Sequence, residues 1–243
     1  MKEIQILVTG VGSGLGKSIS NIANVIGLNR DNRGPVIKKY SEKGVDKIIH
    51  CAFGAQGGYE QYDIDDYYKY VDDNILLTRE LLNIPHKKFI YISSLVVYEK
   101  KLNNYKMTKL YCESMVKKLS SNHLILRCPA ILSCNMRKNN LLKLIEDKDP
   151  KLSLTPSSNF NYVLDTDIYN FITNCDATGI IDFVSSKNIN LQEISSFLNK
   201  NVSFGKYQFC TPEISNKKLI GLYPKMDKTS KDVLSEFLQR RLL

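Results

Sequence analysis

The chain has 243 residues, of which 43% are hydrophobic and 24% are charged, with a formal net charge of +9. This length buries one complete core, or one core with a small annex, and we expect the annex. No apolar run approaches the roughly 18 residues that a membrane span needs, so we expect no membrane anchor. The first ten residues enter a strand at once, so we expect no signal peptide.

The six cysteines stand apart without a C-x-x-C pair, which favours reduced thiols in the cytoplasm over disulfides. The three histidines do not cluster with other ligand residues, so we expect no metal site. Lys and Arg are interleaved with Asp and Glu along the chain, so we expect no nucleic-acid partner. An anionic small substrate or a phosphorylated cofactor accounts for part of the positive charge.

Residues 8–18 read VTGVGSGLGKS, a glycine pattern that two kinds of nucleotide site share. A P-loop ending in the Lys-Ser pair needs a glycine where this chain has Val11. A dinucleotide turn needs its glycines directly after a buried strand, and Gly10, Gly14 and Gly16 stand there. The pattern therefore favours a dinucleotide site.

Strands and helices alternate over the first half of the chain. We predict strands at residues 4–8, 25–30, 46–53 and 88–94 and from His123, and helices after Gly16, over 63–83 and from Tyr105. The long helix 63–83 is expected to carry Tyr67, Val71, Asn74, Leu77 and Leu81 along one side. Residues 31–45 are enough for one crossover only, so the sheet should lack one strand of the usual set. The alternation predicts an α/β fold with a Rossmann-like, doubly wound parallel sheet.

Beyond Ile131 the alternation loosens. Residues 160–168 and 179–186 are predicted to return to the sheet, whereas helices near Leu141 and from Leu191 are predicted to form a small cap. We therefore expect an NAD(P)-binding Rossmann domain over residues 1–133. Residues 134–243 form the mixed remainder, in which 160–186 return to the sheet and the rest binds the substrate.

Several stretches now stand in a fixed order. They are TGVGSGLG, IIHCAF, VDDNILLTRELL with Asn74, Ser93-Ser94, VVY, Tyr105-x-x-x-Lys109, LILRCP, FNYVLDTDI and ISNKKLIGLYP. Together they resemble the short-chain dehydrogenase/reductase family, and in particular its extended branch of sugar-nucleotide epimerases, dehydratases and reductases. The resemblance covers nearly the whole chain. A lone Tyr-x-x-x-Lys is usually a surface pair, but in this order it indicates a catalytic site.

The expected catalytic residues are Ser94, Tyr105 and Lys109. A tyrosine with its usual pKa near 10 is a poor acid or base at neutral pH. Lys109, one helical turn away, favours the phenolate and lets Tyr105 exchange a proton with a substrate oxygen, which Ser94 holds by a hydrogen bond. The family places this serine four residues before Tyr98, which selects Ser94 over Ser93. It also implies a contact of Lys109 with the nicotinamide ribose.

The resemblance implies a larger set of cofactor-binding residues. They are Gly10, Gly12, Ser13, Gly14, Leu15, Gly16, Asn29, Arg30, Cys51, Ala52, Phe53, Asn74, Tyr105, Lys109 and Pro129. Ser13 stands where the extended branch usually has its middle glycine. Only ten residues separate Ser94 from Tyr105, so the substrate loop there is expected to be short.

The end of the second strand predicts the cofactor. NAD enzymes carry an acid there for the ribose hydroxyls, but this chain has Asn29 followed by Arg30. A competing register places the second strand at PVIKKY, with Lys38 and Lys39 near the same site. Both registers predict NADP (NADPH) over NAD, which remains possible.

We therefore expect a cytoplasmic NAD(P)-dependent oxidoreductase acting on a nucleotide-linked sugar. The favoured reaction is that of an NADPH-dependent 4-keto-(6-deoxy)hexose reductase of surface polysaccharide biosynthesis. An NAD-dependent nucleotide-sugar 4-epimerase or dehydratase, and a non-catalytic NADP-sensing protein of the same fold, are the alternatives. In the extended branch the two helices corresponding to 63–83 and 105–121 commonly pair across a two-fold axis. Because Tyr68, Ile75 and Leu76 give the first helix more apolar sides than one core contact requires, we expect a homodimer.

Overall fold

A computed structural model describes residues 4–54 and 66–241 of the chain. It consists of two compact units. The first unit comprises residues up to 127 together with 176–181, and the second comprises 128–175 together with 182–243. The division into a cofactor-binding and a substrate-binding part remains a prediction.

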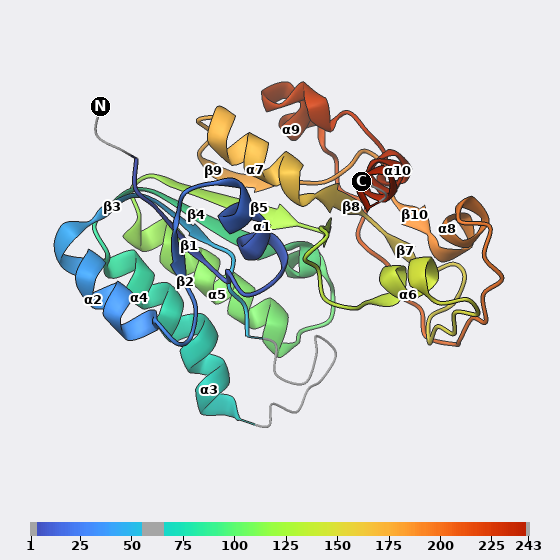
Figure 1. Cartoon of the computed structure of the whole chain (residues 1–243), viewed down its shortest axis with the longest axis horizontal. Helices are drawn as coiled ribbons and strands as arrows, with labels where there is room; N and C mark the ends of the chain where they lie inside the picture. Colours follow the sequence, from blue (N-terminus) through green and yellow to red (C-terminus); the bar gives the residue numbers. More distant parts are fainter. Residues whose placement is uncertain (1–3, 55–65, 242–243) are drawn as a thin grey trace. The chain divides into compact units, whose positions relative to one another are not determined.

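A six-stranded sheet forms the centre of the first unit (Figure 1). Its order is β2 (Ile26–Leu28), β1 (Ile6–Thr9), β3 (Val45–His50), β4 (His86–Ser94), β5 (His123–Cys128) and β9 (Gly179–Asp182). β1 pairs in parallel with β2 and β3, and β3 pairs in parallel with β4. The predicted α/β fold with a doubly wound parallel sheet is confirmed.

The β2 edge of the sheet is short, as expected. A single helix, α2 (Arg33–Lys43), connects β2 to β3. The further strand that we expected this sheet to lack is therefore missing, and β2 forms the edge. The same helix contains the PVIKKY stretch, which overturns the competing strand register. β2 instead pairs with β1 through residues 26–28, and Asn29 and Arg30 follow it.

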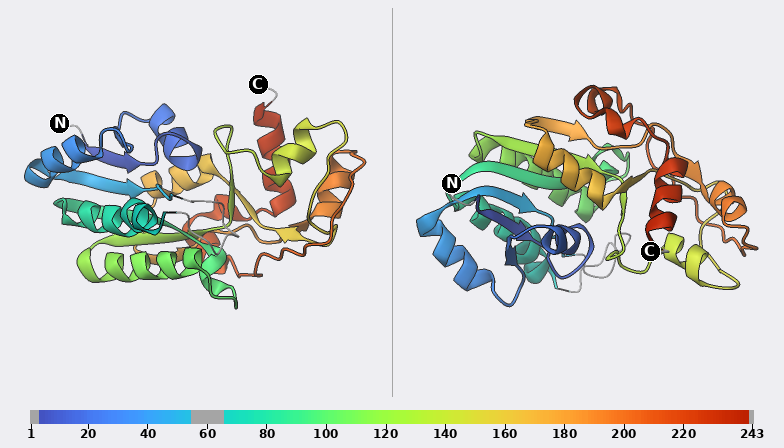
Figure 2. Two further views of the ribbon diagram at one scale, coloured as in Figure 1. Left: turned by 90° about the horizontal axis from the view of Figure 1, so that it is seen from below. Right: turned by 45° about the horizontal axis from the view of Figure 1, so that its top comes forward.

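Helices cover both faces of this sheet. α1 (Gly14–Ile22) lies on one face, and α4 (Leu77–Asn83) and α5 (Asn104–Leu119) lie side by side on the other (Figures 1 and 2). The core beneath α4 and α5 buries Leu81, Phe89, Val116 and Ile125. The hydrophobic faces read from the sequence therefore determine which side of each helix meets the sheet.

The helix predicted over residues 63–83 is not one regular α-helix. Residues 63–65 lie outside the described residues, and the rest consists of α3 (Tyr67–Val71), the π-helical turn η1 (Asp72–Leu76) and α4. A π turn contains an extra residue, so it rotates the preceding turn relative to the following one. Tyr67, which we predicted on the same side of the helix as Asn74, is consequently exposed. Tyr70 is buried instead.

The second unit contains two small sheets. β6 (Ala130–Leu132) pairs in parallel with β8 (Tyr162–Leu164), and β7 (Asn159–Phe160) pairs antiparallel with β10 (Ile189–Asn190). Of the range 160–186, which we expected to return to the main sheet, only β9 does so; β8 is hydrogen-bonded to β6 instead. The other elements are α6 (Asn140–Glu146), α7 (Asp165–Asn174), α8 (Leu191–Phe197), α9 (Lys217–Leu222), η3 (Pro224–Met226) and α10 (Ser230–Arg241).

Candidate functional site

The glycine turn joins β1 to α1. Gly10 and Gly14 have φ angles of +74° and +56°, in the left-handed region that favours glycine. Ser13 is extended, so the left-handed bend of the turn falls at Gly14 and not at Ser13. A Cβ atom on Gly16 would lie 2.5 Å from the carbonyl oxygens of Thr9 and Gly10, so this glycine permits the helix to pack against the turn.

The outer side of the turn is open. A Cβ atom on Gly12 or Gly14 would meet nothing within 4 Å. The first N–H groups of α1, whose N-cap is Ser13, have no partners within the helix and favour an anion. Ser18 is buried and donates its hydroxyl to the Gly14 carbonyl at 3.2 Å, so the Ser of the Lys-Ser pair is used inside the helix. The turn fits a dinucleotide pyrophosphate rather than a P-loop.

Thr9 connects the glycine turn to the loop that follows β3. Its Oγ1 accepts the backbone N–H groups of Cys51 and Ala52 at 3.1 and 3.0 Å. Because these two donors use its acceptor positions, the Thr9 hydroxyl donates to His50 Nδ1 at 2.8 Å. His50 Nε2 lies 2.9 Å from Thr78 Oγ1, which donates to the Asn74 carbonyl. This chain of bonds requires a neutral imidazole.

The pKa of His50 agrees with this arrangement. Complete burial, helped by the positive charge of Lys109, lowers the pKa of His50 to about 3. Burial likewise raises the pKa of the Cys51 thiol to about 12, against the opposing effect of Lys109. Both side chains are therefore neutral at physiological pH, and neither acts as a base here.

Asn74 holds the loop after β3 from the π-helical turn. Its Oδ1 accepts the Gly54 N–H at 2.9 Å, and its Nδ2 donates to the carbonyls of Gly54 at 3.1 Å and Tyr70 at 2.8 Å. These bonds account for the polar side chain of a residue that is only 2% exposed. Asn74 therefore positions the segment containing Cys51, Ala52 and Phe53.

Tyr105 and Lys109 come together on α5. Tyr105 is in the first turn of α5, whose N-cap Asn103 accepts the Lys106 N–H. Lys109 is 3% exposed and donates Nζ to the Ile92 carbonyl at 2.9 Å. The Nζ also lies 4.8 Å from the Phe53 ring centre and 5.8 Å from that of Tyr105. The helix and the β4 carbonyl thus fix the ammonium beside the phenol ring.

Phe53 completes this cluster from the loop after β3. Its ring packs edge-on against Tyr105, with 4.7 Å between ring centres. Lys109 Nζ also lies 4.9 Å from the ring centre of Tyr91, so three aromatic rings surround the ammonium. Such cation–π contacts stabilise a buried positive charge. Lys109 is thus buried, and Tyr105 lies half-buried beside it, so the expected Tyr–Lys pair is not an exposed surface pair.

The two serines that end β4 have different partners. Ser93 is buried and donates to Glu113 Oε1 at 2.6 Å, and that carboxylate accepts two hydrogen bonds from Arg127. Ser94 lies two residues after Ile92 on the strand, and its hydroxyl accepts the Val96 N–H at 3.2 Å. Ser93 therefore has a structural role, whereas Ser94 lies on the same side of β4 as Ile92.

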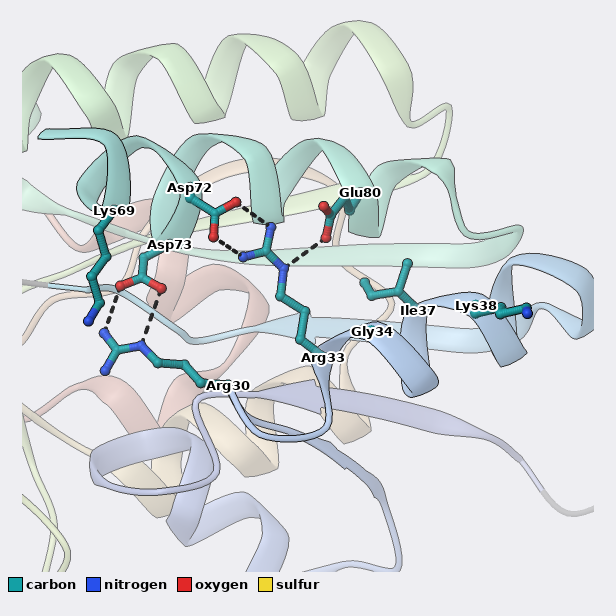
Figure 3. A pocket seen from close by; sticks show the side chains of 9 residues that line it. All are labelled: Arg30, Arg33, Gly34, Ile37, Lys38, Lys69, Asp72, Asp73 and Glu80. Atoms are coloured by element: carbon teal, nitrogen blue, oxygen red, sulfur yellow. Dashed lines mark hydrogen bonds and ion pairs between the residues drawn. The ribbon is translucent and has the colours of Figure 1, made fainter.

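Arg30 lies at the other end of this region, after β2. Asn29 Oδ1 accepts the N–H groups of Asp31 and Asn32, so the side chain of Asn29 closes the loop that presents Arg30. Arg30 forms two hydrogen bonds with Asp73, at 3.2 Å from Nε and 2.7 Å from Nη2 (Figure 3). The pair lines a pocket of about 630 Å³ between α2 and the α3–η1–α4 helix.

The remaining predicted residues lie as follows. Leu15 is buried at the start of α1. Pro129 is in the second unit, between β5 and β6. Within residues 4–54 and 66–241, no group of three His, Cys, Asp or Glu side chains is placed to bind a metal. In the same part of the chain no helix is long and apolar enough to span a membrane.

Sequence reasoning missed several members of this site, namely Thr9, Asp73, Thr78 and the Ile92 carbonyl. The one local signal was Thr9, directly before the first glycine. The others pair with residues 17 to 43 positions away, which no local spacing indicates.

No protein-family model matches the chain, and no curated protein matches it by sequence. Solved structures do resemble it. The dTDP-4-dehydrorhamnose reductase of Bacillus anthracis, in complex with NADP, has a TM-score of 0.78 at 17% identity over 98% of this chain and 99% of that one. The UDP-glucuronic acid 4-epimerase of Bacillus cereus, with UDP-glucuronic acid and NAD, has a TM-score of 0.74 at 20% identity over 98% and 99%.

A third similar structure is the ADP-L-glycero-D-manno-heptose-6-epimerase of Helicobacter pylori. It has a TM-score of 0.73 at 17% identity, covering 97% of this chain and 96% of the other. These neighbours are nucleotide-sugar enzymes of the extended short-chain dehydrogenase/reductase family. The likeness shows that this chain has their fold over nearly its whole length.

Proposed function

We propose that this chain is an NAD(P)-dependent oxidoreductase that acts on a nucleotide-linked sugar. The observation that carries the proposal is the buried Lys109 ammonium, held by the Ile92 carbonyl beside the ring of Tyr105. Burying a positive charge costs free energy, so a buried ammonium indicates a functional role. The open glycine turn and the shared fold with nucleotide-sugar enzymes support the same conclusion.

The residues have separate roles in this proposal. A bound nicotinamide would supply or accept a hydride at the sugar carbon. Tyr105 exchanges a proton with the sugar oxygen, and the positive charge of Lys109 makes the phenol a stronger acid. Ser94 donates a hydrogen bond to the same oxygen as its charge changes. Lys109 also contacts the nicotinamide ribose.

NADPH is the proposed cofactor, with NAD possible. Arg30 lies two residues after β2, and its side chain is 66% exposed, so it is accessible to a 2′-phosphate. Asn29 places no carboxylate at this position. These features favour the reaction of a 4-keto-(6-deoxy)hexose reductase, which consumes NADPH.

The second candidate is an NAD-dependent 4-epimerase or dehydratase. The fold likeness to two nucleotide-sugar epimerases and to a dTDP-glucose 4,6-dehydratase favours it. A reductase and an epimerase differ in their net use of cofactor. The reductase oxidises one NADPH for each sugar reduced, whereas the epimerase leaves the cofactor unchanged.

We further propose a homodimer that pairs the helices of residues 67–83 and 104–119. The outer side of α5 exposes Met107, Leu110 and Tyr111, and the neighbouring helix exposes Tyr68 and Leu76. Exposed apolar side chains on two adjacent helices are typical of a self-complementary interface. Light scattering should give twice the mass of one chain at micromolar concentration, and the mass of a single chain would refute the dimer.

One assay tests the proposed function. The purified protein is incubated with a panel of nucleotide sugars and 4-keto nucleotide sugars, with NADPH or NADH, while nicotinamide absorbance and product masses are followed. We expect oxidation of NADPH with a product two mass units heavier than its keto substrate. Isomerised sugar without net loss of cofactor would support the epimerase. Binding of cofactor with no turnover of any sugar would support the non-catalytic alternative.

A further inference from the structure

The ion pair between Arg30 and Asp73 joins two segments that are 43 residues apart. Arg30 comes from the loop after β2, and Asp73 comes from the π-helical turn. Two parallel hydrogen bonds fix the guanidinium in the plane of the carboxylate (Figure 3). The interaction with Asp73 raises the pKa of Arg30, so the arginine remains charged.

The two partners differ in accessibility. The Asp73 side chain is 11% exposed, whereas that of Arg30 is 66% exposed. A Cβ atom on Gly54 would lie 2.9 Å from both Cβ and Oδ2 of Asp73, so the aspartate lies directly against the loop after β3. The carboxylate is therefore held in place, while the Arg30 side chain is accessible to a ligand from the solvent.

Three other charged residues of the pocket, Arg33, Asp72 and Glu80, are paired with one another. Arg33 binds Asp72 at 2.6 Å and Glu80 at 2.9 Å, and its side chain is only 18% exposed. Arg33 therefore ties α2 to the neighbouring helix. Asp72 and Asp73 are adjacent acids on the same turn, yet each binds a different arginine. This difference gives a matched pair for an experiment.

We propose that Asp73 limits the discrimination between NADPH and NADH, because its carboxylate competes with the 2′-phosphate of NADPH for Arg30. This inference rests on the proposed function, and specifically on Arg30 being the phosphate ligand. A dianionic phosphate that binds Arg30 must displace or share a fixed carboxylate, and it is repelled by that charge. NADH has no phosphate and does not meet this repulsion. Cofactor choice is therefore a property of the charge pair and not of Arg30 alone.

The test compares dissociation constants of NADPH and NADH, measured by fluorescence titration, for the wild-type protein and five variants. Asp73→Asn keeps an oxygen that accepts from Arg30 but removes the charge. We expect it to tighten NADPH binding roughly tenfold and to leave NADH within about twofold. Asp73→Ser, a shorter neutral side chain, should change the ratio in the same direction. Asp72→Asn removes the neighbouring acid and should leave the ratio unchanged.

Arg30→Ala and the double variant Arg30→Ala/Asp73→Asn complete the cycle. We expect Arg30→Ala to weaken NADPH selectively, and the gain from Asp73→Asn to fall to about twofold in its presence. An unchanged NADPH/NADH ratio in both Asp73 variants, with NADH bound normally, would overturn the inference. A ratio that falls would overturn it too, since Asp73 would then orient Arg30 for the phosphate. Failure of the wild-type protein to bind either dinucleotide would refute the proposed function itself.

Discussion

Two cations of the first unit, Lys109 and Arg30, differ in their burial and in their partners. Lys109 is 3% exposed, and its ammonium contacts neutral groups, namely a strand carbonyl and three aromatic rings. Arg30 is 66% exposed and is neutralised by one carboxylate. A buried charge with neutral partners retains its full electrostatic field and keeps the same partners. An exposed charge in an ion pair loses most of its electrostatic field but remains accessible to a ligand, which suits ligand binding rather than proton transfer.

The largest effect is expected from removing the buried cation. Lys109→Met keeps the length of the side chain but removes its charge, so the electrostatic support proposed for the Tyr105 phenolate and the proposed ribose contact are both lost. We expect kcat/KM on the sugar identified by the assay to fall by on the order of a thousandfold. Lys106→Met, one turn closer to the helix start, serves as the control and should stay within about threefold. Similar losses in the two variants would show that the position of the charge is unimportant.

The pH dependence of the free energy of unfolding tests whether the imidazole of His50 has to be neutral in the folded chain. The pKa of His50 is about 3 in the folded chain against 6.5 for a free imidazole, so the unfolded chain binds the extra proton between these values. The contribution of His50 to the free energy of unfolding has its full value above pH 6.5 and decreases as the pH falls toward 3. The loss is about 3 kcal/mol by pH 4.

Chemical unfolding at several pH values checks this slope. His50→Gln replaces the imidazole with an amide, which forms hydrogen bonds but does not titrate. The unfolding free energy of this variant should therefore decrease less steeply over the same pH range. An equal slope in the wild-type protein and the variant would mean that His50 is not responsible.

Tyr105→Phe should have the next largest effect. The ring and its contact with Phe53 remain, but the hydroxyl proposed to protonate the sugar oxygen is deleted. We expect turnover to fall about a hundredfold while NADPH still binds with nearly the same affinity. Tyr111→Phe, an exposed tyrosine on the same helix, is the matched control. Unchanged turnover of Tyr105→Phe on the true substrate would remove the basis of the enzyme proposal.

The smallest effect is expected at the exposed cation. Arg30→Ala removes the guanidinium but leaves the glycine turn intact, so NADPH should bind about tenfold more weakly and NADH about as before. The loss should shrink as ionic strength rises, because exposed charges are screened by salt. Isothermal titration at two salt concentrations measures both effects. Equal weakening of NADH would indicate that the substitution damages the loop rather than a phosphate contact.

The sequence predicted the parts of this unit that local patterns determine. Apolar runs located the strands, the short 31–45 segment predicted the missing strand, and the spacing of Tyr105 and Lys109 placed them on one helix face. The π-helical turn was missed because it changes the helical period by one residue, which a regular pattern cannot show. Asp73 was not singled out, because its partner Arg30 is distant in sequence.

The bonds among Thr9, His50 and Thr78 escaped prediction for the same reason. His50 is buried, and its partners lie on β1 and on the helix after β3. Polar residues at buried positions require partners, yet the requirement does not say which ones. Only the fold, by bringing β1 and β3 side by side, selects them.

The last strand of the main sheet has a consequence for synthesis of the protein. β9 adds to β5 only after the chain has passed through residues 128–175. At a ribosomal rate of about 5–20 residues per second, the hydrogen-bonding edge of β5 stays uncovered for several seconds as the nascent chain emerges. An uncovered strand edge pairs readily with other chains. Overproduction should therefore be most prone to aggregation when translation pauses between residues 128 and 181.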